Sequence, residues 1–174
     1  MEQENTLNPR IYVACLAAYN SGYLHGKWID ADQDADDIMG DIMAMLESSP
    51  IENAEAWAIH DYADFGALQI SEYEGIASVA DIAKFLIKYG LLGSEVAAHL
   101  GADLSEAREA MEDRYIGCFD ALADYMAELT EETTEIPQSL IYYIDYDAMA
   151  RDAEMSGDFF TVRISGDLHV FAGG

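Results

Sequence analysis

The residues best spaced for chemistry are a run of acids, DADQDADD, at positions 30–37. Its alternating carboxylates have the spacing of the first ligands in an EF-hand calcium loop. Such a loop needs glycine at its sixth position, for a sharp turn, and a bidentate glutamate at its twelfth. Here those positions hold Ala35 and Asp41, and residues 23–29 predict a strand where an EF-hand has a helix. We therefore expect a solvated connection between a strand and a helix, and no specific calcium site.

No other group of residues indicates catalysis or a bound cofactor. The four histidines are far apart in the sequence and form no HxxxH or HExxH pattern: His25, His60, His99 and His169. The chain has no GxSxG, P-loop or GxGxxG motif. With 34 acids present, no pair of carboxylates stands out for acid–base work. The sequence therefore predicts a protein that is not an enzyme, needs no cofactor and binds no metal.

The N-terminus and the cysteines predict a cytoplasmic protein. The first ten residues, MEQENTLNPR, lack the basic region and apolar run of a secretory signal. No window approaches eighteen uninterrupted apolar residues, so we expect no transmembrane helix. Cys15 and Cys118 are far apart and form no CxxC pair, which is typical of buried, reduced thiols.

The dominant feature of the chain is its negative charge. It carries 34 Asp and Glu against 8 Lys and Arg, a formal net charge of −26 on 174 residues. Residues 28–83 contain fourteen acids and no Lys or Arg, and residues 115–150 contain eight acids and no base. Since double-stranded DNA carries one charge per ~1.7 Å of axis, 26 charges correspond to about 44 Å of duplex. Such a protein repels nucleic acid and attracts proteins that bind nucleic acid.

One acidic helix has a spacing of charges close to that of DNA. We expect a helix over residues 120–132, with Leu122, Met126 and Leu129 on its apolar face. Its other face carries Asp120, Asp124, Glu128, Glu131 and Glu132. The helix would span about 18 Å, a length over which one DNA strand holds roughly five phosphates. Ordinary solvated helices mix both signs of charge, and this one has no lysine. Charge alone leaves three alternatives open: DNA mimicry, adaptation to high salt, and an acidic adaptor.

Apolar periodicity predicts an α+β fold with three small subdomains. The first, residues 1–62, has two bases and twelve acids. Its expected elements are strands at 11–17 and 24–29 around a hairpin turn at Tyr19-Asn20-Ser21-Gly22, a helix at 34–46 capped by Asp34, and a strand at 55–60.

The other two subdomains cover residues 63–102 and 103–174. In the middle one, a capping box of Ser78 and Asp81 begins a helix that stops at Gly90, and a second helix, 94–100, ends at Gly101. The last subdomain has seventeen acids and four bases. Besides the acidic helix, we expect helices at 105–113 and 145–155, a short strand about Gly117, and a hairpin of strands 159–164 and 168–171 about Gly166-Asp167.

Four stretches resemble the ArdA antirestriction family. They are IYVACLAAYNSGYLHGKWIDA (11–31), WAIHDYADF (57–65), YIGCFDALADYMAEL (115–129) and IPQSLIYYIDYDAMARDAEMSGDFF (136–160), the last around the family's antirestriction motif. The similarity runs from Ile11 to Phe171 in the order of the family. It implies an elongated monomer of three parts, a homodimer, and mimicry of bent B-form DNA. It also implies that the protein occupies the DNA channel of type I restriction–modification enzymes, in the service of mobile genetic elements.

With this resemblance, the expected partners are a type I enzyme and a second copy of the chain, without direct contact to nucleic acid or membrane. We expect the DNA-like acidic surface to consist of Asp30, Asp32, Asp36, Asp37, Asp41, Glu106, Glu109, Asp113, Asp120, Asp124, Glu128, Glu131, Glu132 and Glu135. We expect the apolar dimer contacts to come from Ile136, Leu140, Ile141, Tyr142 and Tyr143. The rival hypothesis is a halophilic or calcium-dependent protein or enzyme whose acids only keep it soluble; the abundance of Leu, Ile and Met speaks against adaptation to high salt.

Overall fold

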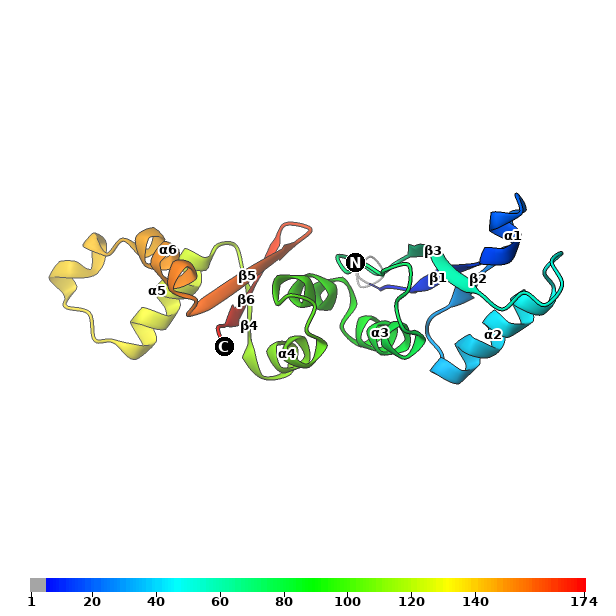
Figure 1. Ribbon diagram of the computed structural model, residues 1–174. Helices are drawn as coiled ribbons and strands as arrows, with labels where there is room; N and C mark the ends of the chain where they lie inside the picture. Colours follow the sequence, from blue (N-terminus) through cyan, green and yellow to red (C-terminus); the bar gives the residue numbers. More distant parts are fainter. Residues whose placement is uncertain (1–5) are drawn as a thin grey trace. The chain divides into compact units, whose positions relative to one another are not determined.

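The computed structural model describes residues 6–174 and shows the predicted α+β fold (Figure 1). The chain forms two compact units, one that ends at Leu104 and one from Ser105 to Gly174. Each unit contains one three-stranded antiparallel sheet, with helices packed against it. The predicted division into three subdomains, at 62/63 and 102/103, stays a prediction.

The first sheet has the strand order β2-β1-β3. Its strands are β1 (Arg10–Cys15), β2 (Gly26–Asp30) and β3 (Trp57–Ala63), each near a predicted strand. In the register of the sheet, Ile11 lies opposite Ile29 and Val13 lies opposite Ile59. These four side chains are almost fully buried and form the core side of the sheet.

The connection between β1 and β2 differs from the predicted hairpin. The chain turns into a short helix, α1 (Leu16–Asn20), directly after Cys15, and a loop then leads to Gly26. The N–H groups of Ser21 and Tyr23 both donate to Ala18 O, at 3.0 and 2.9 Å, and so end the helix. Leu24, predicted to lie in a strand, is 91% exposed in this loop. The alternation of residues therefore predicted the pairing of β1 with β2, but not the helix and loop that connect them.

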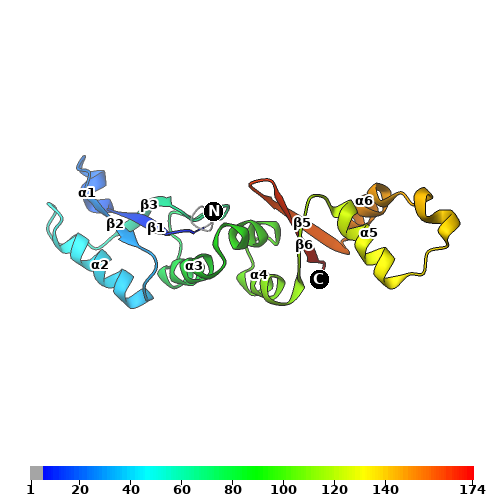
Figure 2. The same cartoon turned by 180° about the vertical axis from the view of Figure 1, so that it is seen from behind.

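The helix α2 (Ala35–Glu47) follows the acidic run and packs on β1 and β2 (Figure 2). Ile38, Ile42 and Leu46 are buried at the spacing predicted for its apolar face. Asp34 occupies the N-cap position, as predicted, but its carboxylate makes no capping hydrogen bond. Instead, Asp34 Oδ1 lies 3.2 Å from Lys84 Nζ on α3. The ion pair therefore replaces the expected cap.

The helix α3 (Ile76–His99) is broken at Gly90, which has φ 65° and ψ −155°. Gly90 therefore ends the first helical segment, as predicted, and the second segment follows without a loop. The predicted start at Ser78 is wrong, because the N–H of Val79 already donates to Gly75 O at 3.0 Å. Ser78 thus lies within the first turn, and Gly75 is the N-cap residue.

A buried serine joins the second segment of α3 to the loop after β3. Ser94 is fully buried; its Oγ donates to Leu91 O at 2.7 Å and accepts from the Ala67 N–H at 3.1 Å. Gly66, with φ +57°, packs so closely on Ser94 that a Cβ there would clash with its Oγ. Only glycine at this position allows the loop to lie against the helix.

The second unit is built on a sheet of order β4-β6-β5. Its elements are α4 (Leu104–Glu109), the π-helical turn η2 (Ala110–Arg114), β4 (Tyr115–Phe119), α5 (Leu122–Thr133), the 3₁₀ segment η3 (Gln138–Tyr143), α6 (Tyr146–Ser156), β5 (Phe159–Ile164) and β6 (Asp167–Ala172). The helices α5 and α6 pack side by side, and their buried residues contact Leu168 and Val170 of the sheet (Figure 2). The strand about Gly117, the helix at 145–155 and the final hairpin are confirmed.

Three details of this unit differ from the prediction. The acidic helix begins at Leu122, so Asp120 precedes it. The hairpin turn lies at Ser165 and Gly166, both with positive φ, one residue before the predicted position. Cys15 is buried as expected, but Cys118 is exposed because it lies on β4, at the edge of the sheet. Within residues 6–174, no helix is long and apolar enough to cross a membrane.

Candidate acidic interface

The acids predicted for the first unit lie at the start of α2 and in the loop before it. Asp30, Asp32, Asp36 and Asp37 are exposed, whereas Asp41 is half-buried. Local hydrogen bonds order this loop: Asp30 Oδ1 accepts from the Asp32 N–H at 2.9 Å, and Gln33 Nε2 donates to Asp41 Oδ2 at 3.0 Å. Across the described residues, no three His, Cys, Asp or Glu side chains are grouped so that they could hold a metal ion.

The second unit presents acids on α4 and η2. Glu106, Glu109 and Asp113 are exposed. Arg114, whose side chain is only 10% exposed, donates through Nη2 to Glu106 O at 3.3 Å and lies 3.8 Å from Glu106 Oε1. Glu106 therefore has a compensating base beside it, and its share of the negative field is smaller than the sequence suggests.

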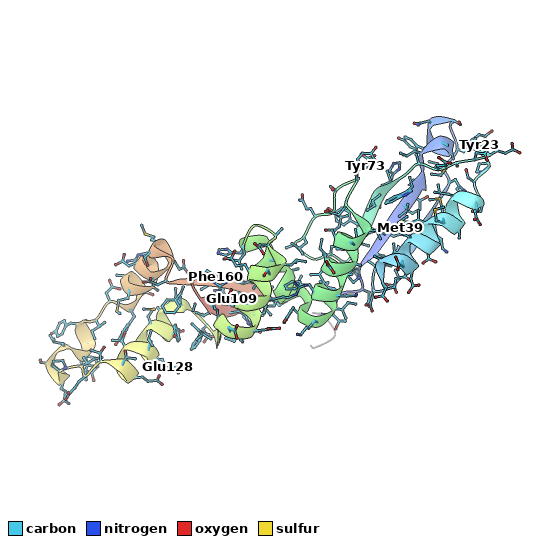
Figure 3. The ribbon with its side chains drawn as sticks, turned by 60° about the horizontal axis from the view of Figure 1, so that its bottom comes forward. Tyr23, Met39, Tyr73, Glu109, Glu128 and Phe160 are labelled. Carbon is cyan, nitrogen blue, oxygen red and sulfur yellow. The ribbon has the colours of Figure 1, made fainter. Side chains whose placement is uncertain are left out.

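The helix α5 carries the densest row of acids. Asp124, Glu128, Glu131 and Glu132 are all exposed, and Glu128 extends away from the helix in Figure 3. Burial raises the pKa of Tyr125, and the negative charges of Glu128 and Glu132 raise it further. Glu128 and Glu132 therefore lie close enough to Tyr125 to oppose its ionisation. With Asp120 outside the helix, the row runs from 124 to 132 and spans about 12 Å.

A shallow hollow of about 270 Å³ follows the C-terminal end of α5. Glu131, Thr134, Glu135, Ile136 and Ile141 line it. Glu135 is exposed, so it extends the row of acids beyond the helix.

The predicted dimer residues form an exposed apolar segment in and next to η3. Leu140, Ile141, Tyr142 and Tyr143 are 51%, 43%, 93% and 83% exposed, and Ile136 is half-buried. A monomer leaves these side chains in water at a considerable cost in hydrophobic free energy.

Reasoning from the sequence missed two acids at the other end of α2, Glu47 and Glu52. Both are exposed, and both line a larger hollow of about 490 Å³. The sequence feature that could have pointed to them is Glu47 in the last turn of α2, a turn that contains no basic residue. A helix end of this kind is unusual, because cations and not anions are favoured at helix C-termini.

The comparisons with known proteins agree with the resemblance seen in the sequence. The model of the family described as "Antirestriction protein (ArdA)" matches residues 11–165, which is nearly the whole chain. No curated protein matches the chain.

Proposed function

The chain belongs to the ArdA family of antirestriction proteins, and from this membership we propose that it inhibits type I restriction–modification enzymes as an acidic mimic of DNA. In this proposal the protein occupies the DNA-binding channel of the methyltransferase core. It blocks restriction, and modification as well, because both activities need DNA in that channel. The proposed site of action is the cytoplasm, where these enzymes meet incoming DNA.

The observation that carries the proposal is the exposure of the predicted acids. Thirteen of the fourteen are exposed and the last, Asp41, is half-buried. Acids that served a catalytic centre or a metal would be partly buried around one point. Here they are spread over the surface of both units, in a chain with 34 acids and 8 bases.

The row of acids on α5 supports mimicry in particular. Four carboxylates lie within about 12 Å, and one strand of DNA carries a phosphate every ~3.4 Å, so the same length of strand holds about four phosphates. A cationic channel would therefore meet a similar density of charge. No bond is made or broken, so the protein acts by occupancy alone and is not an enzyme.

The proposal is tested by competition between the protein and a labelled DNA duplex for a purified type I methyltransferase. We expect the protein to displace the DNA and its affinity to fall as salt rises, because both ligands bind the same cationic channel. An affinity that stays constant between low and moderate salt would contradict mimicry and indicate apolar docking.

We also propose that the protein is a homodimer held by the exposed segment around η3. The dimer would carry a charge of −52, twice −26, so apolar contacts must outweigh the repulsion. Tyr142 and Tyr143 are the most exposed of the apolar side chains there. Sedimentation at micromolar concentration and moderate salt should show a dimer, and a Y142D/Y143D variant should be a monomer. A monomeric wild type would refute the proposal.

A further inference from the structure

One feature that mimicry by charge does not use is the hollow at the C-terminal end of α2. It has a volume of about 490 Å³. The last turns of α2 form one wall and the loop that follows forms the other: Met43, Leu46, Glu47, Ser49, Ile51, Glu52, Asn53 and Ala54. Half of these residues are apolar, so the hollow offers a contact that a row of phosphates does not have.

Hydrogen bonds hold the loop wall of the hollow in place. Ser48 Oγ donates to Met45 O at 2.9 Å, and the Ile51 N–H donates to Ser49 Oγ at 3.2 Å. Ser49 Oγ also lies 3.4 Å from Cys15 Sγ, which is buried. The loop is therefore anchored to both the helix and β1, and a ligand would not have to order it.

The electrostatics of the hollow favour a cation. The C-terminus of a helix carries roughly half a negative elementary charge. Glu47 adds a full negative charge there, and Glu52 lines the same hollow from the loop. The last turn of α2 has no Lys or Arg of its own; the nearby imidazole of His25 is already bonded to Met45 O, at 2.7 Å. Within the described part of the chain, neither glutamate has an ion-pair partner. The placement costs stability in the free protein, and a bound cation would remove that cost.

The mixture of side chains selects the type of cation. Among the described residues no three His, Cys, Asp or Glu side chains are grouped so that they could hold a metal ion, so the hollow is not built for calcium. Met43, which is 51% exposed, and Ile51 offer apolar surface for a hydrocarbon chain. An arginine side chain combines such a chain with a planar group that carries five N–H donors and can bind carboxylates through two parallel hydrogen bonds.

We propose that this hollow receives an arginine side chain of the inhibited enzyme, with its methylene groups on Met43 and Ile51 and its guanidinium group between Glu47 and Glu52. The proposal rests on the proposed function, since it names a contact within that complex. It adds a specific anchor to an interface that is otherwise held by distributed charge. Anchors of this kind, a buried arginine with a shaped pocket, often dominate the binding energy of protein interfaces.

The first test compares two charge-matched double variants in the DNA-competition assay. E47Q/E52Q removes both carboxylates of the hollow, whereas D61N/D81N removes two exposed acids that lie outside it. We expect E47Q/E52Q to weaken inhibition about tenfold and D61N/D81N about twofold, because only the first pair contacts the guanidinium group. M43A, which changes no charge, should weaken inhibition about threefold through lost apolar contact. E47Q/E52Q should also melt at a slightly higher temperature than the wild type, so its weaker inhibition could not come from unfolding.

The second test needs no enzyme. Methionine methyl groups are labelled with ¹³C and followed by NMR while the peptide Gly-Arg-Gly, or its neutral citrulline counterpart, is added. We expect the Met43 signal to shift with the arginine peptide only, and the shift to be lost in E47Q/E52Q. Met155, which is 86% exposed and lies in the other unit, is the control for nonspecific attraction to an acidic surface.

The outcomes distinguish a failure of the proposed arginine site from a failure of DNA mimicry. If the wild type competes with DNA but the two double variants are equally weakened, the hollow is not an anchor, and mimicry stands. If the wild type fails to compete, mimicry is wrong, and the NMR titration alone decides whether the hollow binds arginine. Equal shifts of Met43 and Met155 would overturn the inference.

Discussion

Replacement of the acids on α5 by amides should weaken inhibition in proportion to the number replaced. The perturbation is the set D124N, E128Q, E131Q and E132Q, made singly and together. All four side chains are exposed on one helix of twelve residues, so the changes should leave the fold intact. D120N belongs in the same scan, as a residue next to the helix and not on it.

The expected magnitudes follow from the spacing and exposure of these side chains. An exposed pair of opposite charges at ~4 Å is worth about 1 kcal/mol in water, and often less. Each single variant, D120N included, should therefore lose at most about tenfold in affinity. Four independent losses of about 1 kcal/mol add to about 4 kcal/mol, or roughly a thousandfold, for the quadruple variant. Measured losses below these limits would fit equally well, provided that they add.

The assay is competition with labelled DNA for a type I methyltransferase at one fixed salt concentration. A charge-matched control compares E128Q/E132Q with D152N/D158N, whose acids are exposed in the same unit but outside the predicted surface. Because Glu128 and Glu132 are like charges four residues apart, their replacement should raise the melting temperature slightly while it lowers affinity.

The result that would refute this reasoning is an all-or-none residue. If one amide abolished inhibition and the other three had no effect, that acid would belong to a specific site, and the distributed mimic would be wrong. A quadruple variant no weaker than the single variants would be equally damaging, because it would place the interface elsewhere.

Three further predictions concern stability. S94A should lower the melting temperature by about 5–15 °C, because the Ala67 N–H loses its acceptor, the fully buried Ser94 Oγ, at a cost of about 1–3 kcal/mol. The substitution S71A, at an exposed serine, should change the melting temperature little. Burial lowers the pKa of His169, although Asp167 opposes the shift. The neutral form of His169 therefore stabilises the fold above pH 6.5, and this contribution is lost as the pH falls below 6.5. When the pH is lowered from 7.5 to 5.5, the melting temperature of H169N should therefore rise relative to that of the wild type. Chelation should leave the melting temperature unchanged, because the acidic run at 30–37 lacks the glycine and glutamate of a calcium loop.

Each of these has a result that would contradict it. An unchanged melting temperature in S94A would mean that another group satisfies the Ala67 N–H. For His169, the many carboxylates titrate in both proteins, so their effect cancels in the difference between the two melting temperatures. If that difference stayed constant from pH 7.5 to 5.5, the neutral form of His169 would have no stabilising role. A sharp drop in stability with EDTA would reveal a structural metal.

Much of the site and several of the elements were determined by the sequence alone. The negative charge and its long base-free stretches are properties of the residues, and charged side chains without partners stay at the surface because burial is too costly. The helices α2 and α5 and the break at Gly90 were also readable, since their signals are local: apolar spacing in the first two and a glycine in the third.

The tertiary structure decided whatever depends on residues far apart in the chain. Asp34 pairs with Lys84, fifty residues away, and Ser94 bonds to Ala67, so neither partner could be read from its neighbours. The short helix α1 replaces the predicted hairpin turn at the point where β1 ends beside the start of β3. There the Leu16 N–H donates to Ala56 O, forty residues away. The hollow beside Glu47 is lined by a loop that Ser49 joins to α2, through its N–H and Leu46 O, and to Cys15, through its Oγ. Local propensity sets which segments become helices, but the surface on which a partner can be anchored forms only when distant segments pack together.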